Sequence, residues 1–212
     1  MVFLMLLLSV VITYSQTANI QIFHNKPYEV FDIYIDGRIY HTELKYQESL
    51  RSVNVPLETK IGVATTGLEI EKSIRLDLID GKKYILVVNG SSGNQGSPIN
   101  LKILELENSD AENQLAGFKF LHGVADAPPL DIYLNRDLVV QGQRYGEVNN
   151  LIEIPLDTYV IDLTESRSTH IIARFNVELS VGSQESSLLL ATGFLNPSVN
   201  DSSLSLIIST YD

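Results

Sequence analysis

The sequence predicts an all-β fold: two tandem antiparallel β-sandwiches, immunoglobulin-like or transthyretin-like, that follow a signal peptide. Three observations predict this fold. Apolar and polar residues alternate at the period of a strand, turn residues recur about every ten residues, and one pattern occurs twice along the chain. No amphipathic helix is found, so strands are the expected regular elements.

The internal repeat determines the expected domain organisation, because self-similarity at a fixed spacing indicates repeated structural units. His24 and His122 lie 98 residues apart, and later matches hold an offset of 99. The clearest block is Val-Pro-Leu-Glu-Thr at 55–59, which matches Ile-Pro-Leu-Asp-Thr at 154–158. Chance similarity of composition would not keep order and spacing over this distance, so we interpret the chain as a duplicated domain.

These offsets divide the chain into four parts. We expect a signal peptide at 1–16, a first sandwich at 18–107, a linker at 108–115 and a second sandwich at 116–212. Each sandwich is then within the usual domain size of about 50–200 residues. The linker is too short for free tumbling, so the two sandwiches are expected to keep a preferred orientation.

The amino terminus differs from the rest of the chain. Residues 2–13 form an almost continuous apolar run that is shorter than the roughly 20 residues a membrane-spanning helix needs. Such a run is typical of a secretory signal peptide, although no basic residue precedes it; the alternative is an N-terminal strand. We expect export to the periplasm, the cell surface or the medium, and no membrane span in the mature chain.

Composition excludes several classes of function. The chain has 15 Lys and Arg residues against 26 Asp and Glu residues, a net charge of -11. An acidic surface repels phosphate backbones, so nucleic acid is not expected as a partner. The chain has no Cys, which excludes disulfides, thiolate metal sites and a thiol nucleophile.

In the first sandwich, strands are expected wherever apolar residues alternate with polar ones. The expected strands are 20–22, Phe31–Ile35, 53–55, 61–65, 73–78, 84–89 and 99–106. Turn residues such as Asp36-Gly37 and Asp80-Gly81 separate them.

The second sandwich repeats this order and ends with a strand at 204–210. Buried positions stay apolar while their identities change, as a core that needs only volume and pattern permits. One segment breaks the offset: Val63 falls on Asp162, although the apolar residues there are Ile161 and Leu163. A β-bulge or a one-residue slip would explain the mismatch.

His24 and His122 each end a strand, on the same face as the apolar residues before them. One interpretation is an inward histidine that hydrogen-bonds the following Pro-containing loop and ties it to the sheet. The other is a metal ligand or a general base. Only Asp126 and Asp131 lie near His122 in sequence, which is too few ligands for a zinc-like site, so no metal site is expected.

Asp32 and Asp131 lie opposite the core-facing residues of their strands, beside Tyr34 and Tyr133. We expect exposed or loop-facing carboxylates that accept hydrogen bonds from neighbouring backbone or Tyr groups. Calcium is kept as an alternative because its ligands are oxygens, but no D-x-D-x-D-G loop is present. The candidate binding residues are His24, Asp32, Tyr34, His122, Asp126, Asp131 and Tyr133.

Tyr46 and Tyr145 also correspond in the repeat. They are interpreted either as surface platforms for sugars or as side chains whose hydroxyls bridge core and rim.

The sequence contains none of the common catalytic signatures. H-E-x-x-H, G-x-S-x-G, the Walker loop and a G-x-G-x-x-G before a helix are all absent. Paired carboxylates of the glycosidase type are available in any acidic chain and carry no information here. The sequence therefore favours a protein that is not an enzyme.

The repeat resembles the DUF4397 domain of bacterial secreted proteins, a domain of unassigned function. That family's pattern is His-x-x-x-Asp-Ala-Pro-x-x-Asp-Ile/Val-Tyr followed by Asp/Asn-Gly. The second copy carries it at His122, Asp126, Ala127, Pro128, Asp131 and Tyr133, with Arg136 where Gly is expected. The first copy keeps His24, Asp32, Tyr34, Asp36 and Gly37, but its loop at 25–29 lacks Asp-Ala-Pro.

The resemblance implies a secreted or envelope β-domain, often duplicated, with no known reaction. Our leading hypothesis is an exported, non-enzymatic module that binds an extracellular glycan or protein or serves a structural role. The alternatives are a polysaccharide-acting hydrolase or accessory carbohydrate-binding unit, and a calcium-stiffened adhesin segment.

Overall fold

A computed structural model describes most of the chain, and no helix able to cross a membrane occurs in the part it describes. The predicted signal peptide, apart from Gln16, and the predicted linker, apart from its two end residues, lie outside the described residues. The described ranges are 16–90, 98–108, 115–179, 186–199 and 201–209.

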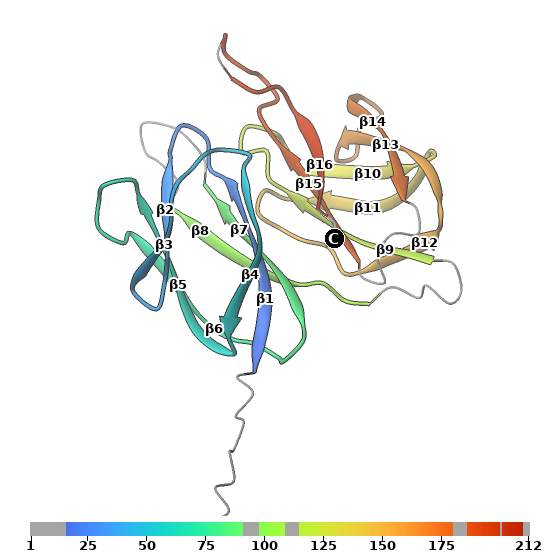
Figure 1. Ribbon diagram of the computed structural model, residues 1–212. Helices are drawn as coiled ribbons and strands as arrows, with labels where there is room; N and C mark the ends of the chain where they lie inside the picture. Colours follow the sequence, from blue (N-terminus) through green and yellow to red (C-terminus); the bar gives the residue numbers. More distant parts are fainter. Residues whose placement is uncertain (1–15, 91–97, 109–114, 180–185, 200, 210–212) are drawn as a thin grey trace, which may run out of the picture.

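The all-β prediction is confirmed, with four-stranded sheets packed as sandwiches (Figure 1). The first sandwich is built from two sheets. One has the order β4 (Ser49–Pro56), β1 (Thr17–Asn25), β7 (Lys83–Asn89), β8 (Asn100–Glu105). The other has the order β3 (Arg38–Leu44), β2 (Phe31–Ile35), β5 (Glu58–Thr65), β6 (Lys72–Asp77).

The second sandwich has the same strand order, with eight added to each strand number. Its first sheet runs β12 (Ile152–Pro155), β9 (Leu115–His122), β15 (Ser187–Thr192), β16 (Ser205–Ser209). Its second sheet runs β11 (Asp137–Gln143), β10 (Leu130–Leu134), β13 (Asp157–Glu165), β14 (Ile171–Leu179). The repeat in the sequence thus corresponds to a repeat in topology.

Each sandwich has its own hydrophobic core between its two sheets. The residues that alternate in the sequence fill it: Ile20, Ile22 and Phe31 in the first sandwich, Phe118 and Phe120 in the second. All five are fully buried, and burying one such side chain contributes roughly 1.5–3 kcal/mol.

The prediction of purely antiparallel sheets is wrong for one strand pair in each sandwich. β1 runs parallel to β7, and β9 runs parallel to β15. Parallel strands are usually covered on both faces and then lose the alternation of apolar and polar residues. β7 and β15 fit this rule, because every residue of β15 and all but the first of β7 are buried.

The outer face of each of these strands is covered by the other sandwich. A third apolar cluster contains Phe23, Ile85 and Val87 of the first sandwich and Leu121 and Leu190 of the second. The sheets that hold β7 and β15 therefore pack against each other through their outer faces (Figure 1). This packing holds the two sandwiches in one orientation.

The mismatch in the repeat is a one-residue slip. Val63 and Leu163 pair with corresponding residues of β2 and β10, Ile33 and Ile132, so the offset there is 100. Asp162 accordingly points outward beside the core-facing Leu163.

The strands β3 and β11 were not predicted from the sequence. Both are edge strands, and five of the seven residues of β3 are exposed. An edge strand with little buried surface has no apolar alternation to detect.

Candidate functional site

The His24 side chain is fully buried and holds the loop that follows its strand. Its Nε2–H donates to the carbonyl oxygen of Glu29 at 3.0 Å, and its Nδ1 accepts from the backbone N–H of Lys26 at 3.1 Å. Because Nδ1 accepts a hydrogen bond, the ring is the neutral Nε2–H tautomer. The ring also stacks on Phe31, with centroids 4.6 Å apart.

His122 makes the same contacts in the second sandwich. Its Nε2–H donates to the carbonyl oxygen of Pro128 at 3.0 Å, and its Nδ1 accepts from the N–H of Val124 at 3.3 Å. Burial lowers the pKa of His24 to about 4 and also lowers the pKa of His122. Both rings are therefore neutral at pH 7 and bonded to the protein's own loops.

The Asp32 carboxylate is also buried. Of the two expected alternatives, an exposed carboxylate is therefore wrong, and a carboxylate that faces a loop is right. It accepts from the N–H of Glu43 at 3.0 Å, the hydroxyl of Thr66 at 2.9 Å and the N–H of Gly67 at 3.4 Å. Burial opposes its ionisation, but these hydrogen bonds outweigh it and hold the pKa of Asp32 below its usual value.

Asp131 occupies the same position in the second sandwich. It accepts from the N–H of Gly142 at 2.6 Å and from the N–H of Arg167 at 3.1 Å. Burial opposes ionisation here too, and the hydrogen bonds again lower the pKa of Asp131. Each of the two donor residues has a positive φ, 66° for Gly142 and 64° for Arg167. The carboxylate thus holds two left-handed turns in place.

We expect Asp131→Asn to lower the free energy of unfolding by about 2–3 kcal/mol, because an amide offers one acceptor oxygen where the ionised carboxylate offers two. Chemical denaturation measured at pH 7 tests this. Asp137→Asn, at an exposed position in β11, serves as the control and should change stability by less than about 0.5 kcal/mol. Equal effects of the two substitutions would contradict the role assigned to Asp131.

Asp126 does not approach His122 as part of a ligand set. Its two carboxylate oxygens accept from the N–H groups of Leu195 and Asn196, each at 2.9 Å. These residues belong to the segment between β15 and β16, so Asp126 fastens that segment to the motif loop. His122, Asp126 and Asp131 therefore hold four different stretches of backbone, because Asp131 alone holds two.

Tyr34 and Tyr133 are half-buried on the outer faces of β2 and β10. Each stands directly across from a residue of the neighbouring strand, Gly62 for Tyr34 and Asp162 for Tyr133. The structure does not bring them together with the histidines of the motif.

Tyr46 and Tyr145 lie between the two sandwiches, so the interpretation as open surface platforms is wrong. The Tyr46 hydroxyl accepts from the N–H of Gly193 at 2.9 Å and lies 3.1 Å from the hydroxyl of Thr192. Burial raises the pKa of Tyr145 to about 12, and its hydroxyl lies near the backbone of Gly90. Each Tyr thus reaches from its own sandwich to the other one.

A buried polar cluster, which was not predicted from the sequence, completes this interface. Asn25 donates to the carbonyl oxygen of Gly123 at 3.0 Å and to Asn89 at 2.8 Å, and it accepts from the hydroxyl of Thr192 at 2.5 Å. Asn25 and Gly123 follow the two histidines directly in the sequence. This position, next to the motif in both copies, was the one feature of the sequence that could have pointed to the cluster.

A metal centre has little support among these contacts. In the described ranges, no group of three or more His, Asp or Glu side chains is placed to hold a metal ion. The calcium alternative stays a prediction, which a thermal melt with and without a chelator would test.

The comparisons agree with part of the sequence interpretation. Residues 116–208 match the family model of DUF4397, described as a domain of unknown function. This range covers the second sandwich from β9 almost to the end of β16. A search of curated proteins finds no match to the chain.

Proposed function

We propose, from the premise that residues 116–208 match a domain family of unknown function, that the chain is an exported, non-enzymatic module of two tandem domains of that family. In this proposal it binds an extracellular glycan or protein. One observation carries the non-enzymatic part: the histidines and the carboxylates of the motif are hydrogen-bonded to the protein's own backbone. A side chain that is already hydrogen-bonded to loops of the protein is poorly placed to exchange protons with a substrate.

The packing of the two sandwiches supports a role in binding. The third apolar cluster and the Asn25 cluster join them through buried contacts. A body whose parts keep one orientation presents its loops in a defined arrangement, which lowers the entropy cost of binding.

Export is tested by expressing the full chain with its own leader in a bacterial host. We expect the protein outside the cytoplasm, with an amino terminus near Ser15 or Gln16. Leu7→Arg, which places a charge in the apolar run, should keep the protein inside the cell. Equal export of the two forms, or recovery of an uncleaved chain, would contradict the proposal.

The absence of catalysis is tested on the same protein with a panel of immobilised polysaccharides. We expect retention on a subset of them without release of reducing ends. Release of reducing ends that disappears in a variant of one carboxylate would support the hydrolase alternative and overturn the proposal.

A further inference from the structure

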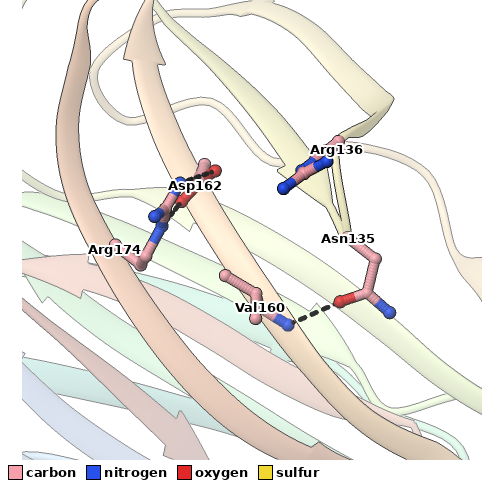
Figure 2. Close-up of a pocket in the computed structure, with 5 residues that line it drawn as sticks. All are labelled: Asn135, Arg136, Val160, Asp162 and Arg174. Carbon is pink, nitrogen blue, oxygen red and sulfur yellow. Dashed lines mark hydrogen bonds and ion pairs between the residues drawn. The ribbon is translucent and has the colours of Figure 1, made fainter.

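The outer face of the second sandwich has a hollow of about 270 Å³ that lies apart from the motif. It is found where the β10–β11 hairpin turns beside β13 and β14. Figure 2 shows its lining: Asn135, Arg136, Val160, Asp162 and Arg174.

The charges in this hollow do not balance. Asp162 is paired with Arg174 through two contacts, Nε to Oδ1 at 2.6 Å and a terminal nitrogen to Oδ2 at 2.8 Å. The hydrogen bond from Arg174 lowers the pKa of Asp162, so this carboxylate is ionised. The second guanidinium, that of Arg136, points toward Asp162 across the hollow (Figure 2), yet no carboxylate of the described residues lies within 4 Å of it. Two guanidiniums against one carboxylate leave one net positive charge.

Arg136 adopts a backbone conformation that suits glycine. Its φ is 80°, and that of Asn135 before it is 48°. The corresponding hairpin of the first sandwich has φ values of 79° at Gly37 and 49° at Asp36. An L-residue with a side chain is strained in this region, and such strain is concentrated at functional positions.

The two sandwiches differ at all the charged positions of the hollow. The strand pairing places Gly62 where the second sandwich has Asp162, and Ser73 where it has Arg174. Gly37 stands in place of Arg136. Arg136, Asp162 and Arg174 are therefore charged in the second sandwich, whereas the equivalent positions of the first sandwich are uncharged. The three charged side chains lie around one hollow although they are separated in the sequence.

We propose that this hollow binds a carboxylated saccharide, with the Arg136 guanidinium paired to the carboxylate of a uronic acid unit. A planar guanidinium fork matches a carboxylate through two parallel hydrogen bonds. One net positive charge balances one carboxylate and leaves a phosphate dianion unbalanced. The oxygens of Asp162 retain lone pairs that can accept from sugar hydroxyls. The volume is near the lower end of ligand pockets, about 300–1,000 Å³, and suits a single sugar unit. This inference rests on the proposed binding function and names its ligand class.

Titration calorimetry of the full chain with tri-galacturonate at low salt tests the proposal, with neutral tri-galactose as the comparison. We expect binding of the acidic sugar and no binding of the neutral one. Arg136→Gly should weaken binding at least about tenfold, as expected for the loss of one charged pair. This variant should also melt a few degrees higher, because glycine fits the left-handed turn. Arg38→Ala, at the corresponding hairpin of the first sandwich, is the matched control and should leave binding unchanged.

Three outcomes would overturn the proposal: equal binding by Arg136→Gly, equal binding of the neutral sugar, or preference for inorganic phosphate or a glutamate-rich peptide over galacturonate. If galacturonate fails to bind while another polysaccharide still retains the chain, this inference fails and the proposed function stands. Release of reducing ends from any of the sugars would instead contradict the proposed function.

Discussion

The free energy of unfolding should fall as the pH drops from about 6.5 to about 4, because both buried histidines favour the neutral form in the folded state. Unfolding exposes each ring and returns its pKa to about 6.5. The unfolded chain therefore binds more protons in this window, and stability increases with pH. For His24, a folded-state pKa of about 4 corresponds to a loss on the order of 3 kcal/mol across the window. The loss is complete near pH 4 and absent above about pH 7.

Urea denaturation at a series of pH values measures this effect. His24→Gln should be less stable than the wild type at pH 7 and should show a flatter pH dependence. His170→Gln, at an exposed position, is the control and should keep the wild-type profile. The buried Asp32 and Asp131 affect stability at lower pH than the histidines do, because their pKa values lie below the usual range. Their contribution to the free energy of unfolding is lost only as the pH falls toward those values. A wild-type profile that is flat between pH 6.5 and 4.5 would show that the histidines are not held neutral by burial.

Gly123→Ala should weaken the packing of the two sandwiches against each other. A Cβ atom at this position would lie 2.6 Å from the carbonyl oxygen of Ala191 and 2.9 Å from a methyl group of Leu190, and it would overlap the Asn25 amide. The carbonyl belongs to β15, so relief requires a shift of the strand that packs against the first sandwich. Overpacking of this kind lowers the free energy of unfolding by about 1–3 kcal/mol.

Chemical denaturation measures the loss of stability, and small-angle scattering measures the spacing of the sandwiches. Gly62→Ala is the matched control, because its Cβ would lie close only to the Ile70 side chain, at 3.1 and 3.3 Å, which can move aside, and at an ordinary contact distance of 3.4 Å from the Tyr34 Cβ. We expect little change in that variant. A destabilisation by Gly62→Ala equal to that by Gly123→Ala would remove the special role assigned to the interface.

Much of the fold could be predicted because burial leaves a periodic signal. Ile20, Ile22 and Phe31 are spaced as core-facing strand residues, and they form the core. The direction of β7 relative to β1 could not be predicted, since a strand covered on both faces has no alternation and parallel and antiparallel pairs share their composition. The one-residue slip at Ile161 was detectable in the sequence, because it moved the apolar residues by one position relative to those of the first copy.

The candidate site could be predicted only in part. The hydrogen bond from His24 to the loop after it connects residues five positions apart, so local sequence was sufficient to suggest it. Asp126 bonds to Leu195, 69 positions away, and no spacing rule connects the two. Arg136 was noticed as a departure from glycine, but its proximity to Asp162 depends on the pairing of β10 with β13.

The sequence by itself determined the β-sandwich class, the repeat, the inward residues and the identity of the motif, because these depend on the alternation of side chains and on turns closed by near neighbours. Only the tertiary structure decided that Asn25 meets Gly123 and Thr192, that Tyr46 reaches Gly193, and that Arg174 pairs with Asp162 in a hollow that Arg136 also lines. These contacts join segments that approach each other when whole sheets pack. The order of residues along the chain does not specify which outer faces will meet.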